Sequence, residues 1–123
     1  MVIDGRRVAD QQWVQINLAR VRAKIEYLKL INWKVCTGQM NPGVASSAKV
    51  FGTEFFTEAY RLLMEIVGQG SVLRRGSPGA ALAGRLERSM QGTLILTFGG
   101  GTNEVQRDLI ALFGLGMPRT PRS

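Results

Sequence analysis

The chain has 123 residues, of which 45% are hydrophobic and 20% are charged. This balance excludes a disordered chain, and the length fits a single globular domain. No apolar run approaches the roughly 18 to 20 residues of a membrane-spanning helix, and the first residues lack the apolar core of a signal peptide. We therefore expect a cytoplasmic protein without a membrane span. A single cysteine, Cys36, and the absence of histidine argue against an internal disulfide and against metal chemistry.

The net charge of +7 is compatible with nucleic acid, a membrane surface or an anionic ligand as a partner. The basic residues are scattered over every segment, however, and aromatic residues do not alternate with them on one face. Such scatter is typical of a solvated surface or of pairing with a more acidic partner chain. A basic helical module that binds nucleic acid is a remote alternative, because the sequence has no recognition motif.

The first predicted helix runs from about Asp10, a favourable N-cap, to Cys36, just before the turn-rich TGQMNPG. At about 1.5 Å per residue it would be about 40 Å long. Its apolar residues recur at spacings of three and four, so they form one stripe that must pack against a neighbour. The stripe consists of Val14, Leu18, Val21, Ile25, Leu28, Ile31 and Val35.

The second predicted helix runs from about Ser46 or Ser47 to Val67 and ends at Gly68, a residue suited to a left-handed helix terminus. Two adjacent rows of apolar side chains cover this helix, which implies burial between two or more neighbours. The rows are Phe51, Phe55, Leu62 and Ile66, and Phe56, Ala59, Leu63 and Val67.

A third helix is predicted from about Ala80 to Phe98, although Gly84 and Gly92 each weaken a helix by about 1 kcal/mol relative to alanine. These small residues could instead allow another helix to approach closely.

The fourth predicted helix follows a run of three glycines, with Thr102 as its N-cap and Glu104 in its first turn. It ends at Gly114 or Gly116, since Pro118 prevents its continuation. Its apolar face consists of Val105, Leu109, Ile110 and Phe113.

These elements predict an all-α fold, an antiparallel bundle of about four helices with no convincing strand. Apolar faces this broad would leave a large exposed hydrophobic surface on an isolated chain, and such a surface normally marks an interface. We therefore expect a partner.

Two glycine-bearing helix ends are candidate ligand sites. The segment GGGTNE precedes a helix, where glycines permit close backbone approach and unpaired N–H groups favour phosphate. The segment matches neither the phosphate-loop pattern nor the dinucleotide fingerprint, and ordinary helix termination explains the same residues. The segment EIVGQGSV, residues 65–72, is likewise either a plain C-cap or a ligand turn. Two such ends could face one phosphorylated ligand.

Three segments together resemble one protein family. GGGTNEVQRDLIALFGLGMPR looks like the C-terminal signature of acyl-CoA dehydrogenases. ASSAKVFGTEFFTEAYRLLMEIVGQG resembles the family's Ser-x-x-Lys helix and Gly-x-Gly turn, and DQQWVQINLARVRAKIEYLKLINWKV resembles the helix before it. The resemblance implies that residues 1–123 are the C-terminal helical domain of such an enzyme, without the bundle's opening helix and the domains upstream. We expect either a fragment of a longer chain or missing parts on another polypeptide.

The resemblance also implies FAD as cofactor, an acyl-CoA thioester as substrate, electron-transfer flavoprotein as acceptor, and a homo- or hetero-oligomer, with a tetramer for the parent enzyme. By position, Thr102 and Glu104 match family residues that contact the pyrophosphate and adenosine portion of FAD. Glu65 through Gln69, with Gly68, match a turn that reaches the adenosine end of a neighbouring subunit's FAD. Two departures put this second match in doubt, because Glu65 stands where Gln is usual and Gln69 where Gly is usual.

The family's reaction is α,β-dehydrogenation, in which a carboxylate takes the α-proton and flavin N5 takes the β-hydride. In many members this carboxylate directly precedes the Gly-Thr pair, and the matching residue here is Gly100, which cannot accept a proton. Glu104 is expected to face the cofactor phosphates rather than the thioester. Three explanations stay open: a base on the missing first helix, a base from a different subunit, or a subunit without catalysis of its own. Gly99 stands where an aromatic residue is usual, which predicts a wider pocket and a bulky acyl group.

Overall fold

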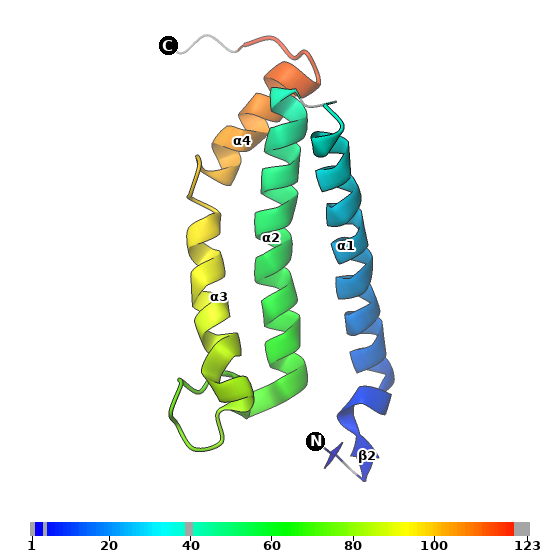
Figure 1. Ribbon diagram of the computed structural model, residues 1–123, viewed down its shortest axis with the longest axis vertical. Helices are drawn as coiled ribbons and strands as arrows, with labels where there is room; N and C mark the ends of the chain where they lie inside the picture. Colours follow the sequence, from blue (N-terminus) through cyan, green and yellow to red (C-terminus); the bar gives the residue numbers. More distant parts are fainter. Residues whose placement is uncertain (1, 4, 39–40, 120–123) are drawn as a thin grey trace.

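The computed structural model describes residues 2–3, 5–38 and 41–119, and this part of the chain is mainly helical (Figure 1). The all-α prediction is confirmed. The α-helices are α1 (Gln12–Cys36), α2 (Pro42–Val67), α3 (Arg85–Leu96) and α4 (Asn103–Leu109), and the π-helix η4 (Ile110–Gly114) continues α4. Short 3-10 helices are η1 (Val8–Asp10), η2 (Gly68–Ser71) and η3 (Ala81–Gly84).

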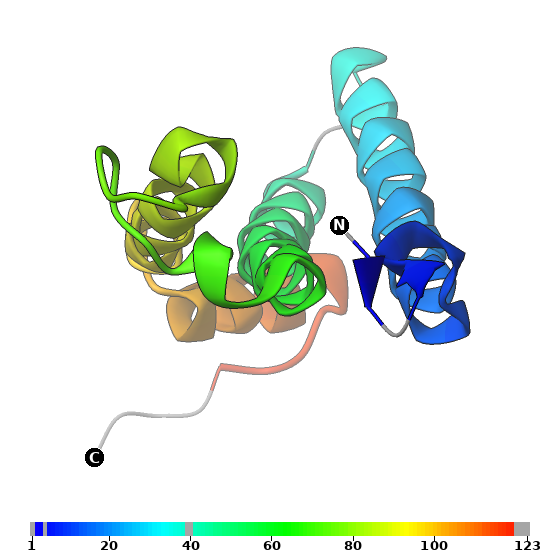
Figure 2. The same ribbon diagram turned by 90° about the horizontal axis from the view of Figure 1, so that it is seen from below.

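Helix α2 is at the centre of the domain. Figures 1 and 2 show α1 on one side of α2, and α3 followed by α4 on the other. Both α1 and α3 run antiparallel to α2, as predicted, and α2 packs against α1, α3, α4 and η4. The core is therefore built around α2, while the sides of α1 and of the α3–α4 pair that point away from α2 are not covered by another helix of the described residues.

A small β-ribbon precedes the helices. Strands β1 (Val2–Ile3) and β2 (Arg6–Arg7) pair antiparallel, with Val2 opposite Arg7. The sequence pattern does not predict these strands. Two residues are too few to show the alternation of apolar and polar side chains that identifies a strand.

Asp10 is not the N-cap of α1, contrary to the prediction. The N-cap is Gln11, whose side chain makes no capping hydrogen bond. The Asp10 carboxylate instead accepts two hydrogen bonds from the Arg7 guanidinium, at 2.8 and 2.9 Å. Because this two-point pairing already satisfies the carboxylate, Asp10 is held away from the backbone of the helix. The end of α1 at Cys36 is as predicted.

The predicted apolar stripe of α1 is only partly buried. Val14 is 1% exposed, whereas Leu18 and Ile25 remain 41% and 36% exposed. A helix that packs against a single neighbour buries only a narrow strip of its surface, and the rest of the stripe is left outside.

Helix α2 begins at Pro42, four residues before the earlier of its two predicted starts. Asn41 is the N-cap, and its Oδ1 accepts a hydrogen bond from the Val44 N–H at 2.9 Å. Pro42 follows at the first helical position, where its missing N–H has no consequence. The Asn-Pro pair is therefore a helix start and not a turn. The predicted end at Val67 is confirmed.

Side chains from both predicted apolar rows of α2 are buried, as expected for a helix that packs between two or more neighbours. Phe55 and Ala59, one from each predicted apolar row, are both buried. Phe56 is an exception, since 42% of it is exposed. Gly52 is also buried, and its face of α2 lies within van der Waals distance of Leu28 on α1.

Helix α3 begins at Arg85 and not at about Ala80. In η3, Leu82 and Ala83 have φ angles of 50° and 54°, in the left-handed region that costs an L residue about 1–2 kcal/mol. These two left-handed residues lie within η3 and interrupt the helical path before Arg85, so the predicted third helix is shorter at its N-terminal end.

Gly84 accounts for the change of direction. It has a φ of 74°, and a Cβ placed on it would lie 2.4 Å from the backbone N of Arg75. Only glycine allows the preceding loop to pack this closely. The expectation that these small residues allow a helix to approach closely is wrong, because the neighbour of Gly84 is a loop and a Cβ on Gly92 would meet nothing within 4 Å.

Much apolar surface is exposed, as predicted. Trp33, Ile95 and Phe98 are each 70% exposed. In the fourth helix, Val105 and Phe113 of the predicted apolar face also point outward. A surface of this kind is typical of an interface, and the partner that covers it stays a prediction. Among the described residues, no helix is long and apolar enough to cross a lipid bilayer.

Candidate functional site

The three glycines form an exposed turn between α3 and α4. Gly100 and Gly101 have φ angles of 70° and 92°, which favour glycine. A Cβ on Gly100 would meet no atom within 4 Å. Over the described part of the chain, the N–H groups of Gly100 and Gly101 donate to no other backbone group. The turn therefore offers free backbone donors at an accessible position.

Thr102 is the N-cap of α4, as predicted. Its Oγ1 accepts a hydrogen bond from the Val105 N–H at 3.4 Å, and its carbonyl accepts one from the Gln106 N–H at 3.0 Å. Glu104 lies in the first turn, beside this cap. Thr102 and Glu104 are thus brought together next to the free amides of the glycine turn.

Lys49 of α2 connects this turn to the central helix. Its Nζ donates hydrogen bonds to the carbonyl oxygens of Thr97 and Gly101, at 3.2 and 2.8 Å. A third bond, of 2.6 Å, goes to Oδ1 of Asn103. One ammonium group therefore joins the end of α3, the glycine turn and the start of α4.

Asn103 is buried and bonds to α2 on its other side as well. Its Nδ2 donates to Oγ1 of Thr53 at 3.1 Å and to Oε1 of Glu54 at 3.3 Å. The same Glu54 oxygen accepts a hydrogen bond from Nη2 of Arg107 at 2.5 Å. The Glu54 carboxylate is therefore already paired with a guanidinium.

The pKa of Glu104 lies below its ordinary value of 4.5. The main cause is a hydrogen bond from its own backbone N–H, followed by one from the hydroxyl of Thr102, with smaller effects from the charges of Arg107 and Lys49. A lower pKa means a weaker base. Glu104 is therefore poorly suited to remove a proton from carbon.

The second candidate turn, Glu65 to Gln69, closes the C-terminal end of α2. Gly68 has a φ of 74°, and the buried Ser71 hydroxyl donates to two carbonyl oxygens of the last turn, at 3.1 and 2.6 Å. The side chains of Glu65 and Gln69 are exposed. The glycine thus serves the capping role, while the two polar side chains are left accessible.

The two glycine-bearing turns do not face one phosphate group within the chain. The first contacts α2 through Asn103 and Thr53, whereas Gly68 lies about 22 Å farther along α2 at 1.5 Å per residue. The expectation that two such ends could face one phosphorylated ligand stays a prediction, and within one chain that ligand would have to span about 22 Å.

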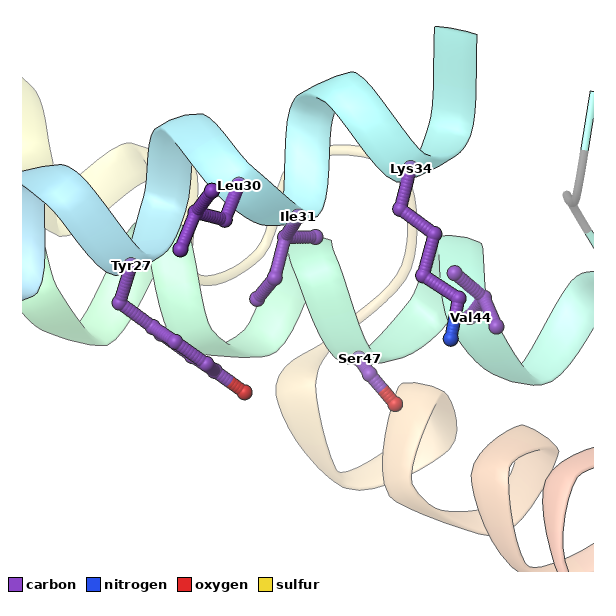
Figure 3. A pocket seen from close by; sticks show the side chains of 6 residues that line it. All are labelled: Tyr27, Leu30, Ile31, Lys34, Val44 and Ser47. Carbon is purple, nitrogen blue, oxygen red and sulfur yellow. The ribbon is translucent and has the colours of Figure 1, made fainter. Parts of the chain in front are cut away.

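A mainly apolar groove of about 340 Å³ lies between α1 and α2 (Figure 3). In Figure 3, side chains from the second half of α1 project toward the first turns of α2. Lys34 is the charged residue of the lining, and the lining includes no carboxylate. Such a lining indicates an apolar contact surface rather than a place for chemistry. The lining residues are Tyr27, Leu30, Ile31, Lys34, Val44 and Ser47.

Comparison with protein families decides the identity. Residues 2–114 match the family model described as acyl-CoA dehydrogenase, C-terminal domain. The chain belongs to the acyl-CoA dehydrogenase family. The resemblance stated from the sequence motifs is thereby confirmed.

Similar proteins include acyl-CoA dehydrogenases from Mycobacterium tuberculosis. Acyl-CoA dehydrogenase FadE26 of M. tuberculosis is 58% identical over 125 residues, which cover 96% of this chain and 31% of that protein. A chain in the crystal structure of the ChsE4–ChsE5 complex from M. tuberculosis is 60% identical, with a TM-score of 0.91 over 97% of this chain and 32% of that chain. A chain of the Tcur3481–Tcur3483 steroid ACAD is 42% identical, with a TM-score of 0.86 over 92% of this chain and 30% of that one. The chain thus spans about a third of the length of the relatives it matches.

In this acyl-CoA dehydrogenase domain, sequence reasoning identified the N-cap and first turn of the site but missed the residues that hold them. Lys49, Asn103 and the Glu54–Arg107 pair come together only in the folded chain, across separations of 48 to 54 residues. The available signal was the Ser46-x-x-Lys49 pattern, which indicated the protein family but not where the Lys49 side chain lies in the fold.

Proposed function

We propose that this chain forms part of the FAD-binding and oligomer-contact surface of an acyl-CoA dehydrogenase that α,β-dehydrogenates an acyl-CoA thioester. Membership of the family carries the proposal. When bound, FAD supplies the hydride acceptor. The free N–H groups of Gly100 and Gly101, beside the hydroxyl of Thr102, support the placement of an anionic part of the cofactor at this turn.

The charges around the turn distinguish the role of each residue. The glycine amides are free donors that suit the pyrophosphate, whereas the Thr102 hydroxyl donates to Glu104 in this structure and would have to turn toward the cofactor. Glu104 is an anionic acceptor, and it therefore suits hydroxyl groups of the adenosine portion better than a phosphate, which it would repel. This assignment replaces the expectation from the sequence that Glu104 faces the cofactor phosphates. Because Glu65, Gly68 and Gln69 lie at the far end of α2, about 18 to 24 Å from Thr53 at 1.5 Å per residue, they fit a contact with the FAD of a neighbouring subunit.

The catalytic base lies outside this chain. Gly100 occupies the position before the Gly-Thr pair and has no side chain to accept the α-proton. Of the two carboxylates beside the turn, Glu54 is paired with Arg107 and Glu104 has a lowered pKa. The base is supplied by another part of the protein or by a different subunit.

A heteromeric assembly is the second candidate, in which this chain belongs to a subunit without catalysis of its own. The two similar solved structures are each named for two proteins, ChsE4–ChsE5 and Tcur3481–Tcur3483. In such an assembly the exposed apolar faces of α1 and α3 would meet partner subunits, and the glycine turn would complete a shared FAD site.

The acyl group in this proposal is bulky, such as a branched or ring-bearing one. Gly99 lacks a left-handed φ, and a Cβ on it would make only an ordinary contact of 3.6 Å with the carbonyl oxygen of Ile95. Neither the backbone nor the local packing requires glycine there, so its small size can serve to leave room for a substrate. One similar structure is named as a steroid ACAD. Electron-transfer flavoprotein is the expected electron acceptor.

The first test is a visible absorption spectrum of the complete protein that contains this chain, purified with and without the product of its neighbouring gene. Flavin absorbance with the protein alone would favour a self-sufficient enzyme. Flavin found only in the mixed preparation would favour the heteromer, and mutation of the partner's carboxylate should then abolish activity. Absence of flavin from both preparations would contradict the proposal.

A matched pair of variants tests the cofactor contact. Thr102→Val removes the hydroxyl at the turn and is expected to raise the Kd for FAD about tenfold, which is the loss of one charge-assisted hydrogen bond. Thr57→Val removes a hydroxyl that donates to the Thr53 carbonyl within α2, at 3.2 Å, and should leave the Kd unchanged. Equal Kd values for the two variants would place FAD elsewhere.

A further inference from the structure

The glycine turn needs an external tether to hold one shape. Glycines have the greatest conformational freedom of all residues, and two of the three here adopt positive φ angles. The turn is also exposed, so burial contributes little to its order. Two side chains reach the carbonyl groups of the glycines: Gln106 donates to the oxygen of Gly100 at 2.8 Å, and Lys49 donates to that of Gly101 at 2.8 Å.

The two tethers differ in what they connect. Gln106 lies on α4, only six residues beyond Gly100, and it moves with the turn. Lys49 lies on the central helix and is partly buried. Lys49 is therefore the tether that fixes the turn relative to the rest of the domain.

The three protons of the Lys49 ammonium are matched by three oxygen acceptors, at 2.6, 2.8 and 3.2 Å. All three acceptors are neutral, and no carboxylate of the described residues lies within 4 Å of this nitrogen. The ammonium is thus saturated with protein contacts and has no proton left for a ligand, yet its charge is not neutralised by a partner. Its field reaches the turn, since it helps to lower the pKa of Glu104.

We propose that Lys49 is a positioning residue for cofactor binding: it holds the Gly99–Thr102 turn against α2 and places an uncompensated positive charge behind it. This inference rests on the proposed function, because the cofactor in question is the FAD assigned to that turn. Lys49 acts through the backbone of Gly101 and the side chain of Asn103, and it does not contact the cofactor. The Ser46-x-x-Lys49 pattern then has a physical role, in which the lysine organises a turn about 50 residues away.

The test compares Lys49→Met with Lys24→Met in the complete protein with its partner. Lys24 is a matched control, because it is also half-buried and joins two helices, through an ion pair with Glu58, but lies on the α1 side of α2. Two quantities are measured in each variant: the Kd for FAD, and the rate of amide hydrogen exchange at Asn103, whose N–H closes the turn by donating to the carbonyl oxygen of Thr97 at 3.2 Å.

Lys49→Met is expected to raise the Kd for FAD about tenfold and to speed amide exchange at the turn about tenfold, as the loss of one net charged hydrogen bond predicts. Lys24→Met should change neither quantity. Unchanged exchange at the turn in Lys49→Met, or the same rise in Kd for both variants, would overturn the inference. If Lys49→Met does not fold, Lys49→Gln is used, since its shorter amide cannot reach three oxygens.

The two proposals fail in different ways. If the wild-type protein binds no FAD, alone or with its partner, the proposed function and the cofactor part of this inference both fall. If FAD binds to the wild type and to Lys49→Met with equal affinity while the turn exchanges faster, the proposed function stands and the positioning role is refuted.

Discussion

Gly43, in the first turn of α2, provides a sharp test of how closely α2 and η4 approach. A Cβ placed on Gly43 would lie 2.6 Å from Cα and 2.7 Å from N of Gly114. Carbon atoms in contact prefer about 3.5–4.0 Å, so the two backbones would have to separate by about 1 Å. No side-chain rotation relieves this clash, because the obstructing atoms belong to the backbone of η4.

The expected effect of Gly43→Ala is a net destabilisation of about 1–2 kcal/mol. Overpacking of this kind typically costs about 1–3 kcal/mol, while alanine regains up to about 1 kcal/mol of helix propensity. Gly43 does not have a left-handed φ, so backbone strain contributes nothing to the difference. The close approach of the α2 and η4 backbones therefore makes Gly43→Ala destabilising rather than stabilising.

Two other glycines serve as controls, because their replacement by alanine should stabilise the protein. A Cβ on Gly52, in the same helix, would make an ordinary 3.6 Å contact with Cδ1 of Leu28, and one on Gly92 in α3 would meet nothing within 4 Å. Gly52→Ala and Gly92→Ala should therefore each stabilise the protein by about 0.5–1 kcal/mol. Gly114→Ala is also tolerated, because its Cβ would lie 3.6 Å from Cα of Gly43.

The assay is urea denaturation of the four variants in one background, with the shift of the midpoint read at constant m. If Gly43→Ala stabilised the protein as much as Gly52→Ala, the backbone contact between α2 and η4 would be refuted.

Three further predictions concern single groups. Thr102→Val should raise the pKa of Glu104 toward 4.5 in an NMR titration, and an unchanged pKa would show that the Thr102 hydroxyl does not bond to Glu104. Because the pKa of Glu104 is lower in the folded than in the unfolded state, this hydrogen bond stabilises the folded state above pH 4.5, and its contribution is lost as the pH falls through the folded pKa. Gly99→Phe should change the free energy of unfolding by less than about 0.5 kcal/mol but lower kcat/KM for ring-bearing acyl-CoAs relative to short linear ones; equal losses on both would count against a wide pocket. Lys24→Met should destabilise by less than about 1 kcal/mol, because the Lys24–Glu58 ion pair is partly exposed, and a loss above 3 kcal/mol in denaturant titration would show that the pair is more than a surface bridge.

Local signals predicted some helix ends correctly and others wrongly. Thr102 was recognisable as an N-cap because it follows glycines and precedes an apolar helical pattern. Asp10 has an equally good N-cap side chain, but Arg7 binds it instead. The competition between a cap and an ion pair depends on a neighbour whose position comes from the β-ribbon, so the sequence pattern alone could not resolve it.

Tertiary contacts explain the remaining differences. Leu82 and Ala83 favour helix by propensity, yet they are left-handed where the loop backbone packs on Gly84. Propensities do not contain such long-range packing. In the sequence, Lys49 is not distinguishable from the other fifteen basic residues, because only the fold brings the glycine turn beside it. The candidate turn was thus predictable, while the network that holds it was not.

The central position of α2 also bears on how the domain reaches its folded state. Helices α1 and α2, and helices α2 and α3, are antiparallel neighbours that follow each other along the chain. Five residues separate α1 from α2, and 17 residues, which include η2 and η3, separate α2 from α3. Contacts between neighbours this near in the chain are associated with rapid folding. The α2–α4 contacts bridge about 50 residues, so the entropy of closing that longer loop opposes them. We therefore expect the helical hairpins to form early and the glycine turn to reach its final shape last.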